Sequence, residues 1–70
     1  MRSNLKNARK KAGMTQQQVA DKLGINLRYY KAVESGERLG SIKWWDALED
    51  LLNVPQRVLR ENYLDTKDNQ

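Results

Sequence analysis

The side chains best suited to chemistry in this sequence are basic and aromatic, and they crowd into one stretch, NLRYYKAVESGE, at residues 26–37. Arginine and lysine bind phosphates and base edges, and tyrosine hydroxyls bind phosphates, so the stretch indicates contact with a polyanion. Acid–base and nucleophilic catalysis are disfavoured, because the chain has no His, no Cys, no glycine-rich phosphate loop and no convergent pair of carboxylates. We therefore predict no enzyme activity, no cofactor and no metal.

The charges are divided unevenly along the 70 residues. Residues 1–43 carry a net charge of +7 and residues 44–70 a net charge of −3, which leaves +4 for the chain. A basic front half favours nucleic acid as the partner. No apolar run approaches the ~18 residues of a membrane span, and the start, MRSNLKNARK, lacks the apolar core of a secretory signal. We therefore expect a soluble, cytoplasmic protein.

Glycines and a single proline divide the chain into five segments, each with an apolar spacing of about 3.6 residues. This pattern predicts an all-α fold, a compact five-helix bundle over residues 1–62, followed by a polar, frayed tail at residues 63–70. We expect helices from Leu5 to Ala12, from Thr15 to Gly24, from Asn26 or Leu27 to Ser35, from Ser41 onward and from Pro55 onward.

Short local signals mark the ends and the buried faces of these helices. Thr15 and Gln18 fit a capping box at the start of the second helix, and Ser3 or Asn4 is the expected cap of the first. Trp44 faces away from the core stripe, either as a contact surface or partly buried beneath the preceding loop. The residues expected to face inward in the last two helices are Ile42, Trp45, Leu48, Leu52, Val58 and Leu59.

The most specific pattern in the chain is a set of five spaced positions within residues 16–33. It consists of Gln16, Ala20, Gly24, Tyr30 and Val33, at spacings of 4, 4, 6 and 3. A small residue at Ala20 lets two crossing helices approach, and Gly24 supplies the positive φ that a tight turn needs. Tyr30 and Val33 are expected in the core. Together these positions predict a DNA-binding helix-turn-helix formed by the second and third helices.

At these residues the chain resembles the phage-repressor-like helix-turn-helix regulators, called the Xre or Cro type. The resemblance covers Leu5 to Leu59 and rests on LKNARKKAGMTQQQVADKLGI, VESGER and LEDLLNV. It implies a compact five-helix fold whose third helix enters the DNA major groove. It also implies a cytoplasmic protein of a bacterium or phage, associated with the nucleoid. The chain departs from the family pattern at Tyr30, at Leu39-Gly40 and at Glu49, so no operator sequence can be borrowed from relatives.

The outward side of the third helix follows from about 100° of rotation per residue, with Tyr30 and Val33 turned inward. Arg28 is then placed for paired hydrogen bonds to guanine O6 and N7, unless it is a plain solvated arginine. Leu27 can meet a thymine methyl group, and Asn26 an adenine or a phosphate; for Lys31 a phosphate contact is the alternative. The predicted base-reading residues are Asn26, Leu27, Arg28, Lys31 and Ala32.

Residues around that helix are expected to hold the DNA backbone. The first turn of the second helix offers exposed backbone N–H groups and glutamine amides to a phosphate. The segment after the third helix is where this family often touches the backbone. The predicted phosphate-binding residues are Gln16, Gln17, Tyr29, Arg38, Ser41 and Lys43.

Two charged residues lie within apolar stripes, Arg9 in the first helix and Glu34 in the third. A lone buried charge is too costly to keep, so two such residues should pair. We predict a structural salt bridge between Arg9 and Glu34, and the family resemblance supports the same pair.

The function expected from these features is sequence-specific binding of double-stranded DNA by a transcriptional regulator, a repressor of prophage or mobile-element type. It should act as a homodimer, at least on DNA, with a dimer patch at Val58, Leu59, Tyr63 and Leu64. The alternative is an antitoxin or another module whose main partner is an unknown protein, bound near Trp44 or the last helix, with secondary DNA binding. Architectural DNA binding and RNA binding are weaker alternatives; for RNA, the aromatic residues lie on helices and not on a stacking sheet.

Overall fold

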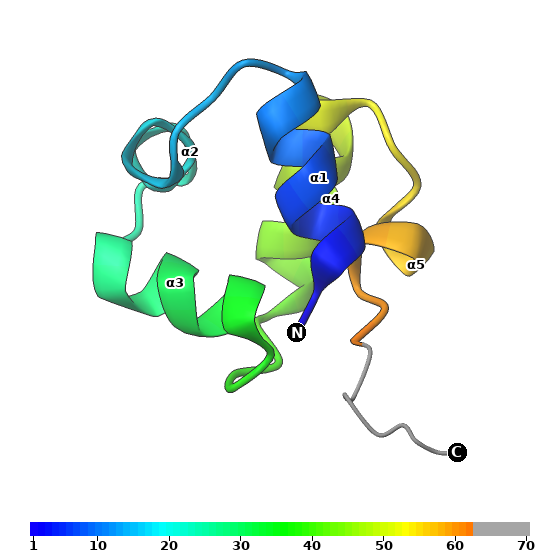
Figure 1. Ribbon diagram of the computed structural model, residues 1–70. Coiled ribbons are helices and arrows are strands. Elements are labelled where there is room, and N and C mark those ends of the chain that lie inside the picture. Colours follow the sequence, from blue (N-terminus) through cyan, green and yellow to red (C-terminus); the bar gives the residue numbers. More distant parts are fainter. Residues whose placement is uncertain (63–70) are drawn as a thin grey trace.

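The computed structural model describes residues 1–62 and contains five helices in that range. They are α1 (Ser3–Lys11), α2 (Gln16–Leu23), α3 (Leu27–Ser35), α4 (Ile42–Leu52) and α5 (Gln56–Leu59). The described residues contain no strand, so the predicted all-α class is confirmed. The helix pair α2–α3 lies at one side of the molecule and α5 at the other (Figure 1). The tail predicted at residues 63–70 lies outside the described residues.

The helix-turn-helix is built by local signals at the ends of α2 and α3. The Thr15 hydroxyl accepts a hydrogen bond from the Gln18 backbone, and the Gln18 side chain accepts one from the Thr15 backbone, which completes the predicted capping box. Gly24 ends α2 at φ 73° in the left-handed region. The side chain of Asn26 caps α3, which ends at Gly36 with φ 93°.

The start of α1 differs from the prediction. The helix begins at Ser3, two residues earlier than expected, and its cap residue is Arg2, which makes no side-chain cap hydrogen bond. Asn4 lies inside the helix, and its Nδ2 donates to Val58 O at 3.2 Å. The Arg2 backbone N–H donates to Glu34 O at 3.0 Å. A tertiary contact therefore sets the helix start where a Ser or Asn side chain was expected to set it.

The core joins four long helices and α5 around Trp45 and Tyr30, which are both buried as predicted. Leu48, Leu52 and Leu59 are buried too, whereas Val58 is only half-buried. The prediction for Ile42 is wrong, because this side chain is 70% exposed. Ile42 is the first residue of α4, and the buried stripe of that helix begins three residues later, at Trp45. The buried apolar residues are Leu5, Val19, Ala20, Tyr30, Val33, Trp45, Leu48, Leu52 and Leu59.

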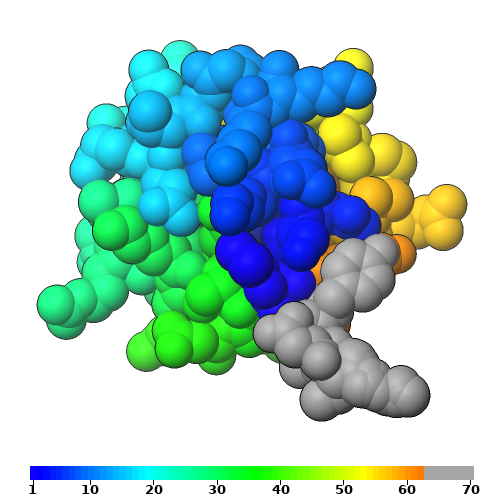
Figure 2. All heavy atoms as spheres, viewed as in Figure 1, coloured from blue at the N-terminus to red at the C-terminus, as the bar shows by residue number. Residues whose placement is uncertain are grey.

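The turn between α2 and α3 is held by the small residue at its base. Ala20 is fully buried, and its carbonyl accepts a hydrogen bond from the Ile25 backbone at 3.0 Å. In the space-filling view, side chains of α1, α2 and α3 meet without an open gap (Figure 2). The core therefore fixes α3 from behind and leaves its other side to solvent. Within residues 1–62, every helix is too short or too polar to cross a membrane.

Candidate nucleic-acid interface

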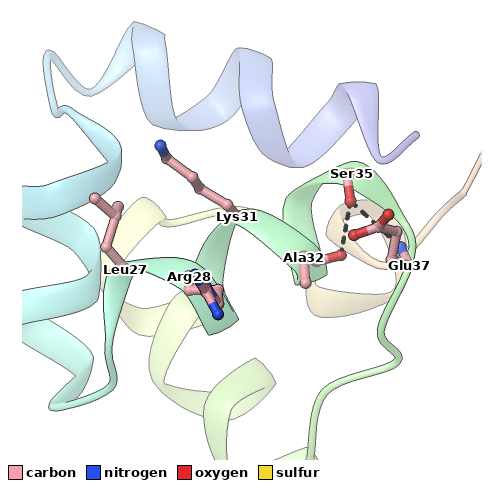
Figure 3. A pocket seen from close by; sticks show the side chains of 6 residues that line it. All are labelled: Leu27, Arg28, Lys31, Ala32, Ser35 and Glu37. Atoms are coloured by element: carbon pink, nitrogen blue, oxygen red, sulfur yellow. Dashed lines mark hydrogen bonds between the residues drawn. The ribbon is translucent and has the colours of Figure 1, made fainter.

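The solvent-facing side of α3 forms a shallow groove of about 440 Å³. Four of the five predicted base-reading residues line it, together with Ser35 and Glu37; the four are Leu27, Arg28, Lys31 and Ala32. Figure 3 shows Arg28 and Lys31 leaving the helix in different directions, with Lys31 on the side nearer α1. Both side chains are exposed. The helix thus presents two separated positive charges, and the small side chain of Ala32 in the same groove lets a ligand approach the helix closely.

Asn26, the fifth predicted base reader, has a structural task at the start of α3. Its Oδ1 accepts a hydrogen bond from the Tyr29 backbone at 2.7 Å. Paired recognition of adenine needs the amide oxygen as well as the amide nitrogen. Because its oxygen already caps α3, Asn26 is poorly placed for that paired contact, whereas its N–H donors suit a phosphate or a single base acceptor.

Two predicted phosphate-binding residues, Tyr29 and Arg38, come together beside the groove. The Arg38 guanidinium carbon lies 5.9 Å from the centroid of the Tyr29 ring, a cation–π contact. Both residues line a neighbouring groove of about 420 Å³ that also includes Asn26 and Arg28. Tyr29 is half-buried and packs against the core, so it gives the exposed Arg38 side chain a fixed platform.

Behind α3, the carboxylate of Glu34 is the centre of a buried hydrogen-bond network. Glu34 is 2% exposed and accepts hydrogen bonds from Arg9 Nε at 2.9 Å and from Arg9 Nη2 at 3.3 Å. It also accepts from Tyr30 Oη at 2.8 Å and from Gln16 Nε2 at 3.1 Å. The Arg9–Glu34 ion pair stands where the apolar stripes placed it, and it joins α1 to α3.

Two pKa values record this network. The hydrogen bond to Glu34 raises the pKa of Arg9, against the opposing effect of burial. Burial, followed by the hydrogen bond to the Glu34 carboxylate, raises the pKa of Tyr30 well above that of a free tyrosine. The phenol of Tyr30 therefore stays protonated and remains a donor to Glu34 over the whole physiological range.

Gln16 connects this buried network to the exposed start of α2. One of its two amide N–H donors is used by Glu34, and the other is left for an external acceptor such as a phosphate. Gln17 is exposed, and its Nε2 donates to Asp21 at 2.8 Å within α2. Gln16 is thus the better placed of the two predicted phosphate ligands, because its position is fixed from behind.

Ser41 and Lys43 are exposed at the start of α4 and line none of the grooves beside α3. Ser41 is the cap residue of α4, but its side chain makes no cap hydrogen bond. The Lys43 ammonium lies 5.0 Å from the centroid of the Trp44 ring, and Trp44 is half-buried. Part of the Trp44 surface is therefore covered within the chain itself.

Comparison with known proteins agrees with this geometry. A family model described as "Helix-turn-helix" matches residues 5–59. The chain belongs to the phage-repressor-like helix-turn-helix family. It is also similar to the "Cryptic phage CTXphi transcriptional repressor RstR" of Vibrio cholerae serotype O1, with 45% identity over 53 residues, which cover 70% of this chain and 47% of the relative. The chain thus spans about half the length of that curated relative, and no solved structure matches it significantly.

Near the helix-turn-helix, the structure draws attention to two residues that the sequence did not single out. Glu37 is an exposed acid that lines the same groove as Arg28 and Lys31. Its sequence signal was available, because Glu37 is an acid in the same stretch, residues 26–37, as Arg28 and Lys31. Arg2 is 3% exposed, although arginine is among the residue types that are mostly found at the surface. No local pattern marks Arg2, because its partners lie far along the chain.

Proposed function

We propose that the protein binds double-stranded DNA in a sequence-specific manner, with α3 in the major groove, and represses transcription as prophage-type regulators do. One observation carries the proposal. The side of α3 opposite the buried Tyr30 and Val33 is an open groove with exposed Arg28 and Lys31. Membership of the family and similarity to a protein named as a phage transcriptional repressor point in the same direction.

Each part of the surface has a chemical task in this proposal. Arg28 donates two parallel hydrogen bonds to guanine, and Leu27 contacts a thymine methyl group. Gln16, Arg38 and the start of α4 neutralise or hydrogen-bond phosphates and so set the register of α3 on the duplex. The remaining predicted ligands, Gln17, Tyr29, Ser41 and Lys43, extend these backbone contacts.

The working unit proposed on DNA is a homodimer, because this docking mode reads two half-sites about 34 Å apart. The predicted dimer patch needs correction, since Leu59 is fully buried and Tyr63 and Leu64 lie outside the described residues. Within residues 1–62, Leu39 is 75% exposed, and with Ile42 it offers apolar surface beside the start of α4. A light-scattering mass of one chain at micromolar concentration, both free and on DNA, would refute the dimer.

The alternative of a protein-partner module draws no specific support from the structure. It predicts a partner surface around Trp44 or the last helix. Trp44 is half-buried with the Lys43 ammonium over its ring, and in α5 Leu59 is fully buried and Val58 half-buried. A pull-down that recovers a stoichiometric protein partner and abolishes DNA binding would reverse this ranking.

The deciding experiment is fluorescence anisotropy at ~150 mM salt with two duplexes. One duplex carries DNA from upstream of the protein's own gene and the other a shuffled copy of the same composition. We expect a preference of ~10³-fold or more for the first, lost in Arg28→Ala. The matched control is Arg57→Ala, which removes the same charge from an exposed position of α5, at the other side of the molecule. Equal loss in both variants would mean that Arg28 contributes only its charge.

A further inference from the structure

The side chain of Arg2 is buried against backbone carbonyl groups from three separate segments. Arg2 Nη1 donates to Val33 O at 2.6 Å and to Arg38 O at 2.8 Å, and Arg2 Nε donates to Arg60 O at 3.1 Å. Val33 lies in the last turns of α3, Arg38 in the segment after it, and Arg60 at the end of α5. One guanidinium therefore ties the end of α3 and the following segment to α5.

The carbonyl groups at a helix end have no partner within the helix and carry the negative end of its dipole. A cation with fixed, planar donors is suited to that position. Burial lowers the pKa of Arg2, so keeping the charge inside has a desolvation cost that the carbonyl oxygens offset. The Arg2 guanidinium carbon also lies 5.3 Å from the centroid of the Trp45 ring.

The segment after α3 is held at two successive carbonyl groups. Arg38 O accepts from Arg2, and Leu39 O accepts from Trp45 Nε1 at 2.9 Å. Glycines flank the segment, with Gly36 at φ 93° and Gly40 at φ 79°, so its own backbone does little to restrain it. When the Arg38 carbonyl is fixed inward on Arg2, the Arg38 side chain lies outward over Tyr29, beside the proposed DNA groove.

We propose that Arg2 is a positioning residue for DNA binding, which holds the backbone of residues 36–40 so that Arg38 meets a DNA phosphate in a preset place. This inference rests on the proposed function, in which Arg38 binds the DNA backbone. Arg2 itself is too deeply buried to touch DNA, so its contribution passes through Arg38. Without it, Arg38 O loses the Arg2 donor and Val33 O is left with the Gly36 backbone N–H at 3.2 Å, so the segment must be ordered anew at each binding event.

The test is a double-variant cycle in the full chain, with Arg2→Met, Arg38→Ala and the combination. Apparent affinity for the upstream duplex is measured across a salt series, at a temperature where circular dichroism shows every variant folded. Loss of one phosphate contact lowers the log–log salt slope by about 0.9. We expect Arg38→Ala and Arg2→Met each to lower it by that amount and to weaken binding roughly tenfold, and the combination to do no more than either alone.

A second cycle is the matched control, with Arg2→Met combined with Arg28→Ala. In the proposed function Arg28 reads a base, a contact separate from the phosphate contact of Arg38, so these two effects should multiply to roughly a hundredfold. If loss of Arg2 acted only by removing a positive charge, its effect would multiply with Arg38→Ala as well. That outcome would overturn the proposal.

Native-state hydrogen exchange reports the segment directly. The Glu37 and Arg38 amides both donate to Ala32 O, at 2.9 Å and 3.1 Å. Arg2→Met should accelerate their exchange far more than that of Leu48 in the core, whereas Leu52→Ala, a core truncation at the other end of α4, should accelerate all of them alike. Equal acceleration by both variants would reduce Arg2 to a general stabiliser and overturn the positioning role.

Arg2→Lys is the second variant in case Arg2→Met does not fold. It keeps the charge but lacks the planar fork that reaches two segments at once, so it should show the same coupling to Arg38→Ala in weaker form. A wild-type salt slope in Arg38→Ala refutes this inference, yet leaves the proposed function standing if Arg28→Ala still abolishes the preference for the upstream duplex. Equal binding of the parent protein to the upstream and shuffled duplexes refutes the proposed function itself.

Discussion

Replacing Arg9 by methionine tests whether the buried network behind α3 carries the stability of the domain. Methionine keeps most of the apolar stem of Arg9 but removes its hydrogen bonds to Glu34, at 2.9 and 3.3 Å, and to Met14 O, at 2.8 Å. Breaking a buried ion pair from one side typically costs ~3–5 kcal/mol, because the other charge is left buried without its partner.

The structure indicates the lower end of that range. Glu34 still accepts from Tyr30 Oη and Gln16 Nε2 after Arg9 is gone, so its carboxylate is not left bare. We expect a loss of about 3 kcal/mol in the free energy of unfolding. A chain of this size is stabilised by only ~4–10 kcal/mol, so the variant should lose a third or more of its stability and melt about 10 °C or more below the parent.

Urea unfolding followed by circular dichroism at neutral pH measures the effect, since urea carries no charge that would screen the pair. Lys10→Met is the matched control, because Lys10 is the exposed neighbour of Arg9 and should change stability by less than ~0.5 kcal/mol. The combination of Arg9→Met with Glu34→Gln, which leaves a neutral amide among the same donors, should be more stable than Arg9→Met alone. The reasoning would be refuted if Arg9→Met were within ~0.5 kcal/mol of the parent, or if the combination were less stable than Arg9→Met alone.

Three further outcomes are expected from single changes. Tyr30→Phe should lose about 1.5–3 kcal/mol at neutral pH, because the 2.8 Å hydrogen bond to the Glu34 carboxylate disappears. The raised pKa of Tyr30 stabilises the fold fully below pH ~10 and progressively less above it, since the unfolded tyrosine ionises first. Above pH ~10 the parent should therefore lose up to ~1.4 kcal/mol of unfolding free energy per pH unit through this residue. Urea titrations of Tyr30→Phe should lack this dependence. Glu37→Gln should tighten binding to the shuffled duplex in the anisotropy assay, because an exposed carboxylate in the groove beside Arg28 repels phosphates; weaker binding to the upstream duplex alone would instead indicate that Glu37 accepts from a cytosine. Gly24→Ala should destabilise the domain by about 1–2 kcal/mol in thermal melts, from backbone strain at φ 73° alone, since an added Cβ there has nothing within 4 Å, and Gly24→Asn should cost less.

The sequence by itself determined the helix-turn-helix and the side of α3 that faces solvent. The capping box of Thr15 and Gln18, the left-handed turn at Gly24 and the stop at Gly36 involve residues a few positions apart, so a linear pattern contains all of their partners. The same applies to periodicity, which placed Tyr30 and Trp45 in the core. Even the Arg9–Glu34 pair followed from two charges that each fell within an apolar stripe.

Only the tertiary structure decided what lies opposite each buried face. The start of α1, the exposure of Ile42 and the engagement of Gln16 with Glu34 depend on how helices distant in sequence pack together. Arg2 is the clearest case, because it reads as a solvated cation beside its neighbours, while its carbonyl partners lie 31, 36 and 58 positions away. Periodicity tells which side of a helix is buried, but a hydrogen bond to a distant carbonyl exists only once the packing has brought the two ends together.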